Sequence, residues 1–153
     1  MSQFDPAMFL DTTITEPSTK RNPLTAGADF VGIIGEVKSR TWTGRADPTK
    51  GGVVVDVPIV VDLSAYPDEA KRVGADKVTL TDGIMLDITE GGMIDNSPGK
   101  NGKLRRYREA LDMNKPGDAF SFRAMQGRTI KVKISHRTYE GEIFDQVDSV
   151  AKA

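Results

Sequence analysis

Hydrophobic and polar residues alternate along several segments of the chain, and this period-two pattern predicts a mainly β protein. The first such segment runs from 29 to 43 and predicts one long strand. Its parity places Val31, Ile33 and Val37 on the face toward the core. The opposite face of this strand is polar and carries Glu36, Lys38, Arg40 and Trp42.

Two more strands are expected after the first. The segment 53–63 has apolar residues at every second position, and Pro58 on the other parity indicates an edge or a bulge, because proline donates no ladder hydrogen bond. The segment 77–89 repeats the alternation, and its interruption at Asp82 and Gly83 predicts a bulge or a sharp bend.

The rest of the chain predicts one substantial helix and a hairpin. The helix spans roughly 103–113 and is ended by the proline and glycine of residues 114–117. Two β-runs follow and predict a hairpin that turns around 135–138. The parity of its first strand directs Lys131 and Lys133 outward.

The resulting order, β-β-β-α-β-β, predicts a mainly β fold, namely a five-stranded OB-fold-like barrel with one helix between strands three and four. Five short amphipathic strands are equally compatible with an SH3-like or another small barrel. Residues 1–27 lack a sustained period and contain three prolines, so we expect an extended N-terminal arm there. Residues 28–153 would form the barrel domain.

The composition is typical of one soluble domain. A chain of 153 residues with 38% hydrophobic and 28% charged residues has room for one sizeable core. No apolar run approaches the ~18 residues of a membrane helix, and the N-terminus lacks the pattern of a signal peptide, so we expect a cytoplasmic protein without membrane association. Because the chain has no cysteine, disulfides, thiol catalysis and cysteine-ligated zinc are excluded.

Positive charge is concentrated in one part of the sequence. The formal net charge is −1, yet residues 99–137 hold 11 Lys and Arg against 3 Asp and Glu. The net charge is −6 over residues 1–99 and +5 over residues 100–153. A basic segment beside aromatic residues suits a polyanion with flat rings, and single-stranded nucleic acid is the commonest such ligand.

Cations and aromatic residues in several segments are candidates for nucleic-acid contacts. Trp42 shares strand parity with Lys38 and Arg40, so it would stack a base unless it caps the end of the barrel. Tyr139 would either stack a base or pack under a loop. The cations of the last hairpin and of the helix would form a phosphate track, and the alternative is an ordinary solvated face. The full candidate set is Lys38, Arg40, Trp42, Arg45, Lys50, Lys100, Lys103, Arg105, Arg106, Lys131, Lys133, Arg137 and Tyr139.

The segment 127–147 resembles the closing hairpin of small bacteriophage proteins that bind single-stranded DNA. In that family a G+…V+V…R-x-Y-x-G-[ED]-x-[FY]-x-x-V pattern ends an OB-fold domain, and Arg137, Tyr139 and Gly141 stand at the matching positions of this chain. The segment 102–111 is also similar to the start of the helix in such proteins. The resemblance covers about 50 of the 153 residues.

This resemblance implies a phage replication or recombination protein that coats single strands in the host cytoplasm without sequence specificity. Its implied partners are single-stranded DNA, phage replication or recombination proteins, and other copies of itself. Many members of the family end in a long acidic tail that recruits replication enzymes, whereas this chain ends with residues 148–153, Asp-Ser-Val-Ala-Lys-Ala. Recruitment through such a tail is therefore not expected. The alternative is a phage structural or host-interacting protein whose acidic N-terminal half faces a protein partner.

The sequence lacks the residues that the common types of catalytic site require. His136 is the only histidine, and no Gly-x-Ser-x-Gly motif is present. The segment 99–104 is not a phosphate-binding P-loop, because its glycine spacing differs and a leucine stands where Ser or Thr would bind Mg²⁺. Asp56, Asp62, Asp82 and Asp87 are the carboxylates that a two-metal site would need. The first two alternate with inward valines and so face solvent, and we expect no enzyme, no cofactor and no metal.

Overall fold

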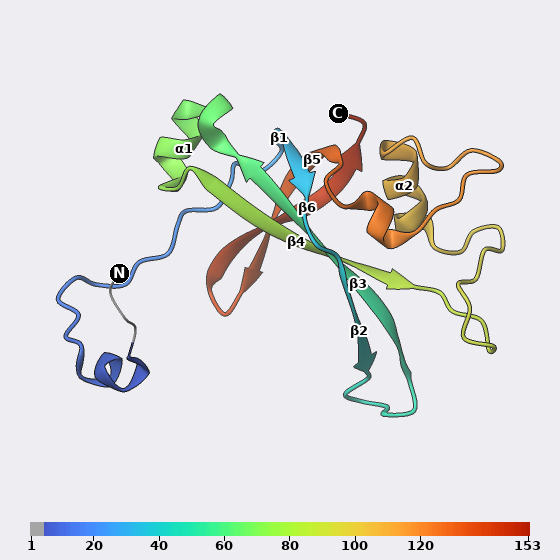
Figure 1. Cartoon of the computed structure of the whole chain (residues 1–153), viewed down its shortest axis with the longest axis horizontal. Helices are drawn as coiled ribbons and strands as arrows, with labels where there is room; N and C mark the ends of the chain where they lie inside the picture. The colour runs from blue at the N-terminus through green and yellow to red at the C-terminus, as the bar shows by residue number, and fades with distance from the viewer. Residues whose placement is uncertain (1–4) are drawn as a thin grey trace.

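Six strands form one antiparallel sheet in the computed structural model, which describes residues 5–153 (Figure 1). The strands are β1 (Asp29–Ile34), β2 (Lys38–Thr43), β3 (Gly51–Asp62), β4 (Lys77–Leu86), β5 (Thr129–Tyr139) and β6 (Glu142–Ala151). The helices are α1 (Pro67–Val73) and α2 (Gly102–Ala110), and the short 3-10 turns are η1 (Pro6–Asp11), η2 (Leu63–Ala65) and η3 (Phe122–Met125). The mainly β class predicted from the sequence is confirmed.

The centre of the sheet is β3. One of its edges pairs with β4, and the other edge pairs with β2 and then with β1. From β1 the sheet continues through β5 to β6. Within residues 5–153 no ladder joins β4 to β6, so the sheet is open. The closed five-stranded barrel expected from the sequence is therefore not observed.

A bulge divides the expected first strand into β1 and β2. Ile34 pairs with Ile59 and Lys38 pairs with Asp56. Between these two pairs, the β1–β2 side therefore contains one more residue than the β3 side. Pro58 lies opposite this bulge, and its carbonyl accepts a hydrogen bond from the Gly35 N–H at 2.8 Å. Its position agrees with the edge or bulge predicted from its missing N–H.

The bulge also shifts the parity of β1. Phe30 and Ile34 are buried in the core, whereas Val31 and Ile33, which were predicted to face the core, are exposed. Val37, beyond the bulge, packs against the core as a partly buried residue. The sequence-based assignment of the β1 faces was therefore wrong, because one extra residue reverses the alternation of a strand.

No bulge interrupts β4, although the sequence predicted one at Asp82 and Gly83. The register with β3 is continuous along the whole of β4. Asp82 therefore shares the inward parity of Leu80 and Ile84, and only 9% of it is exposed. A carboxylate at an inward position breaks the apolar–polar alternation of the sequence even though the strand is continuous. Its polar partners come from a distant segment, so the sequence near Asp82 does not reveal them.

The predicted closing hairpin is present, but its turn lies later in the chain. Glu140 and Gly141 have φ angles of 50° and 78°, the positive values that a two-residue type I′ turn needs. The predicted turn at 135–138 instead lies inside β5, which continues to Tyr139. This end of β5 is exposed, so its residues are polar as turn residues usually are, and the sequence pattern therefore predicted a turn there.

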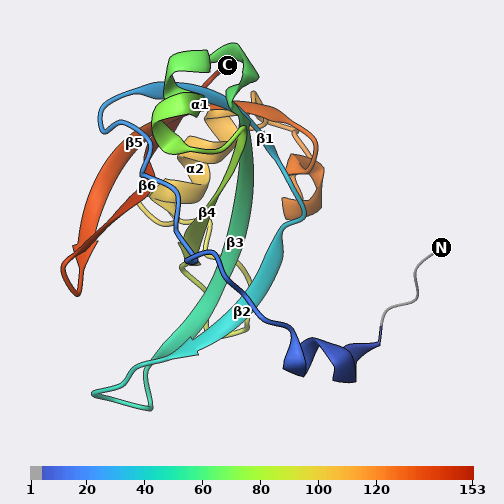
Figure 2. The same cartoon turned by 90° about the vertical axis from the view of Figure 1, so that its left-hand side faces the viewer.

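The helix α2 lies in the space between β4 and β6 (Figure 2). Its residues Leu104, Tyr107 and Ala110 are buried. Lys103 Nζ donates to Asp82 Oδ1 at 2.7 Å, and Tyr107 Oη donates to Asp82 Oδ2 at 2.5 Å. The helix thus packs against both strands at the seam, where β4 and β6 approach each other without forming a ladder.

The C-terminal end of the N-terminal arm packs against the rest of the protein. Leu24 is fully buried, its N–H donates to Asp145 Oδ2 at 2.8 Å, and His136 Nε2 donates to its carbonyl at 2.6 Å. Arg21 forms an ion pair with the same carboxylate at 2.7 Å. Residues 5–19 are exposed and lead away from the sheet (Figures 1 and 2). Of the expected arm, residues 1–4 lie outside the described residues.

Candidate nucleic-acid interface

The outer face of the sheet carries predicted site residues from two strands that are far apart in the sequence. Lys38 and Ile33 have cross-strand partners on the outward parity of β3. On the other side of β1, Lys131 of β5 lies opposite Val31. The residues that share this outer face are Lys38, Arg40 and Trp42 of β2 and Lys131 and Lys133 of β5.

Trp42 lies on this outer face and not in the core. Its direct partner on β3 is Gly52. A Cβ atom on Gly52 would come within 2.8 Å of Trp42 Nε1 and 3.3 Å of Trp42 Cε2, so the indole lies directly over the glycine backbone. Trp42 is half-buried. Part of the ring therefore remains available for contact with a ligand.

Arg40 is engaged by a carboxylate on the neighbouring strand. Its Nε donates to Asp56 Oδ2 at 2.7 Å and its Nη2 to Asp56 Oδ1 at 3.4 Å. The side-chain hydrogen bond to Asp56, together with the attraction of opposite charges, raises the pKa of Arg40. A phosphate would have to compete with Asp56 for this guanidinium, so β2 offers less free positive charge than the sequence indicated.

Lys131 and Lys133 border an apolar strip on β1. Val31 and Ile33 are 41% and 53% exposed on the same face as the two lysines. Asp29 lies opposite Lys133 at the end of the strip. The sequence reasoning missed Val31 and Ile33 as surface residues because it had assigned both to the core.

The loop between β2 and β3 carries Arg45 and Lys50, both exposed. Its shape is fixed by Asp47, which accepts hydrogen bonds from the N–H and the hydroxyl of Thr49 at 3.0 and 2.5 Å. The hydrogen bond from the Thr49 hydroxyl, with that from its N–H, lowers the pKa of Asp47. The loop thus presents its two cations from an ordered turn.

The β5–β6 hairpin carries the remaining predicted aromatic residue. Tyr139 is 63% exposed beside the turn. The guanidinium of Arg137 lies 5.5 Å from the ring centroid of Phe144 on β6. This turn and the β2–β3 turn extend to the same side of the molecule in both views (Figures 1 and 2).

Lys103 and Arg106 belong to the seam and not to the outer face. The Lys103 ammonium is held by Asp82 and by the Gly83 carbonyl, at 2.7 and 2.9 Å. Arg106 lines a small cavity with Tyr107 and the last residues of β6. Burial and the negative charge of Asp82 raise the pKa of Tyr107 far above its usual value, so the phenol stays a proton donor to Asp82.

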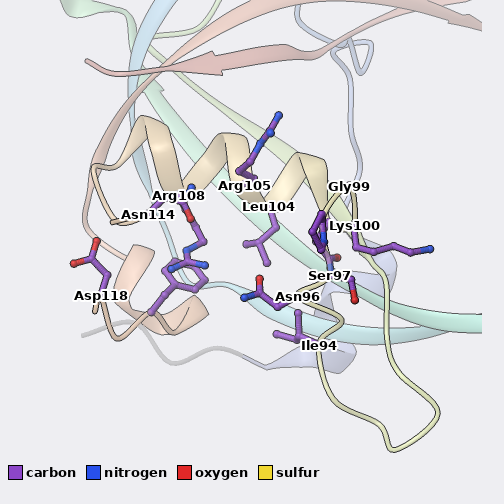
Figure 3. A pocket seen from close by; sticks show the side chains of 13 residues that line it. Ile94, Asn96, Ser97, Gly99, Lys100, Leu104, Arg105, Arg108, Asn114 and Asp118 are labelled. Atoms are coloured by element: carbon purple, nitrogen blue, oxygen red, sulfur yellow. The ribbon is translucent and has the colours of Figure 1, made fainter. Parts of the chain in front are cut away.

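A pocket of about 660 Å³ runs along α2, and we call it the α2 pocket. Figure 3 shows Leu104 pointing into it, Lys100 and Arg108 toward its two ends, and Arg105 directed away from Leu104. Arg105 Nε lies 3.7 Å from Glu109, in an exposed ion pair. Lys100 and Arg105, predicted as part of one phosphate track, therefore lie at this pocket, apart from the outer face of the sheet.

Two further residues line the α2 pocket: Arg108, one of the helix cations expected on the phosphate track, and Phe120, which the sequence reasoning placed in no site. The Arg108 guanidinium lies 4.9 Å from the Phe120 ring centroid, and its Nε donates to the Met113 carbonyl at 3.1 Å. Arg108 follows Leu104 by four residues, a spacing that places both on one side of a helix. That spacing is a signal, available from the sequence, that Arg108 lies beside Leu104.

The wall of the α2 pocket is fixed by one asparagine. Asn101 Nδ2 donates to the carbonyls of Asp87 and Asp95 at 3.0 and 2.8 Å. The Asp87 N–H donates to Asn101 Oδ1 at 2.8 Å. Asn101 adopts a positive φ of 52° and is buried. The loop that borders the pocket is thereby held by hydrogen bonds within the chain.

In residues 5–153 no group of three or more His, Cys, Asp and Glu is placed to hold a metal ion. No helix in that part of the chain has the length and apolar character needed to cross a membrane. In comparisons with known proteins, no protein-family model matches the chain and no curated protein matches it significantly.

Proposed function

We propose that the protein binds single-stranded DNA without sequence specificity, and that it serves phage DNA replication or recombination. The observation that carries the proposal is the outer face of the sheet, where Trp42 shares β2 with Lys38 and where Lys131 and Lys133 border exposed apolar residues. Lysines suit phosphates and an indole suits any base, so this combination favours binding that tolerates every sequence.

We also propose that the fold is an OB fold whose barrel is open at one seam. Taken as one bent strand, β1 and β2 pair with β3, β3 pairs with β4, β1 pairs with β5, and β5 pairs with β6. This pairing scheme and the position of α2 between β4 and β5 support the proposal. In OB folds, oligonucleotides bind across strands two and three and between the loops that follow strands one and four. Those loops correspond here to the β2–β3 turn and the β5–β6 turn.

In the proposed mechanism the chain binds a strand and performs no chemical step. Lys38, Lys131 and Lys133 neutralise phosphates, and the release of counterions provides a salt-dependent part of the affinity. Trp42 stacks one base, and Tyr139 stacks a second at the edge of the face. Val31 and Ile33 give the sugars and bases an apolar surface between the two groups of cations.

The proposal is tested by titrating the full chain with oligo-dT while recording the fluorescence of Trp42, the only tryptophan. Stacking should quench this fluorescence, and single-stranded competitors of any sequence should reverse the quench while duplex competitors should not. If about four cations contact phosphates, the log–log slope of affinity against salt should be about −3, from ~0.7 per phosphate. A flat salt response, or no binding, would contradict the proposal and would favour a protein-binding role for the same face.

A further inference from the structure

The N-terminal arm combines exposed apolar residues with negative charge. In residues 5–19 the acidic residues are Asp5, Asp11 and Glu16, and the segment contains no Lys or Arg. Met8, Leu10 and Ile14 are 70%, 87% and 77% exposed. A soluble chain rarely leaves several large apolar side chains together in water without a surface that covers them.

Part of this arm is folded without any burial. The turn η1 is capped by Asp5, whose carboxylate accepts a hydrogen bond from the Ala7 N–H at 3.0 Å, and none of the residues of η1 is buried. Single helical turns are not stable in water by themselves, because ordering the backbone costs more than a few hydrogen bonds return. We therefore expect η1 to be stabilised by packing against another surface.

The α2 pocket has the complementary character. Leu104 and Ile94 provide apolar walls, and Lys100 and Arg108 lie at its two ends, with Arg105 at the rim. Asp118 is the only acidic residue among those that line it. An occupant with apolar side chains and negative charges would bury its apolar side chains against the walls and pair its negative charges with the cations.

We propose that η1 and the residues after it dock into the α2 pocket of a second copy of this chain. The arm leaves its own body beside β6 and α1, through the contacts of residues 21–25, and extends on the side of the molecule away from α2 and its flanking loops (Figure 1). The stretch 10–20 reaches about 30 Å when extended, at ~3.3 Å per residue, which is enough to cross to a neighbour. This inference does not rest on DNA binding.

The first experiment measures self-association of the full chain by sedimentation velocity over a range of protein concentrations. The parent should form dimers or longer chains, and high salt should weaken them. The double variant Met8→Asp with Leu10→Asp should remain monomeric. The control Thr13→Asp with Thr15→Asp adds the same charge to the arm without removing apolar side chains, and it should associate like the parent.

The second experiment changes the pocket. Ile94→Asp with Lys100→Glu should abolish association, whereas Met93→Asp with Lys71→Glu, two exposed residues outside the pocket, should not. Circular dichroism of each variant checks that it is folded. The decisive sample is an equimolar mixture of the arm variant and the pocket variant, each monomeric alone. The mixture should form a heterodimer, because one intact arm then meets one intact pocket.

Five outcomes would overturn the inference. One is a parent that stays monomeric at every concentration, and another is an arm or pocket variant that associates as the parent does. A third is a mixture of the two variants that remains monomeric. The fourth is a monomer whose pocket amides lose their slow hydrogen exchange when the arm is changed, because the arm would then occupy the pocket of its own chain. Protection of the pocket by oligo-dT, with no effect of the arm variant, would make nucleic acid the occupant instead.

Discussion

The indole of Trp42 lies across Gly52, its direct partner on β3, so closely that any side chain at position 52 would collide with the ring. One face of the indole is thus supported by backbone, and the ring is held in place before a ligand arrives. Preorganisation of this kind lowers the entropy cost of stacking a base.

The first prediction concerns the ring itself. Trp42→Ala should lower the affinity for oligo-dT by about 1–3 kcal/mol, the usual contribution of one stacked base. Because Trp42 lies outside the core, the melting temperature should change little. Fluorescence anisotropy of a labelled oligonucleotide and thermal unfolding measure the two effects, and Trp42→Phe should keep part of the affinity. A large loss of stability with unchanged affinity would mean that the ring is structural.

The second prediction concerns the glycine under the ring. Gly52→Ala would place a Cβ atom 2.8 Å from Trp42 Nε1, so the indole must shift. The affinity for oligo-dT should fall although every candidate contact residue is retained, and the emission of Trp42 should change in the free protein. Gly91→Ala is the matched control, since its Cβ would have no neighbour closer than 3.9 Å. Equal effects of both variants would rule out a role for the Trp42–Gly52 contact.

The third prediction concerns the two lysines of β5. Lys131→Glu with Lys133→Glu should weaken oligo-dT binding and reduce the log–log salt slope by about 1.4, from ~0.7 per lost phosphate contact. The fold should persist, because both side chains point outward. Lys71→Glu, an exposed residue of α1, should leave the slope unchanged. An unaltered slope in the double variant would remove these lysines from the interface.

The fourth prediction concerns acid stability and Asp145. Partial burial alone would raise its pKa, but the hydrogen bonds from Arg21 and the Leu24 N–H outweigh it and hold the pKa below the ordinary value. A depressed carboxyl pKa stabilises the fold above the unfolded-state pKa of about 3.9, and this contribution disappears as the pH falls through the lower folded-state pKa. Asp145→Asn should therefore be less stable than the parent near neutral pH.

Urea unfolding at a series of pH values measures this difference. The gap in stability between the parent and Asp145→Asn should shrink as the pH drops below about 5, since protonation removes the same charge from the parent. Asp148→Asn, at an exposed position on the same strand, serves as the control and should show no such gap. A gap that stays constant down to the acid limit would contradict the assignment.

The fifth prediction concerns the buried carboxylate of the seam. Tyr107→Phe removes the 2.5 Å hydrogen bond to Asp82 and leaves one buried oxygen without its partner. The expected cost is about 1–3 kcal/mol of unfolding free energy. Tyr139→Phe, at an exposed phenol, should cost almost nothing, and denaturant unfolding compares the two. A neutral Tyr107→Phe would mean that water replaces the phenol.

Much of the strand pattern could be predicted from the alternation of residues. The outward parity of β2 and β5 was read correctly because both strands cover the core on one side only. The parity of β1 was predicted wrongly, because the amino-acid composition does not reveal the single extra residue of a bulge. Asp82 was read as an interruption because its partner Tyr107 lies 25 residues away in the chain.

The candidate site was only partly accessible from the sequence, for a similar reason. Counting charges over 99–137 joined lysines and arginines that the fold distributes over the sheet face, the seam and the α2 pocket. Sequence proximity does not decide which face of a helix or sheet a cation occupies. Arg40 shows the same limit, since its pairing with Asp56 follows from strand register and not from spacing.

The position of α2 between β4 and β6 has a consequence for solubility. The edges of these two strands that face the seam are unpaired with each other, and unpaired edges are templates on which strands of other molecules can add. The helix packs against both strands, with Leu104, Tyr107 and Ala110 buried and with Lys103 and Tyr107 bonded to Asp82 of β4. If α2 detached, the molecule would expose two strand edges at once and could polymerise by strand addition, so the packing of α2 and its hydrogen bonds to Asp82 also protect the protein against aggregation.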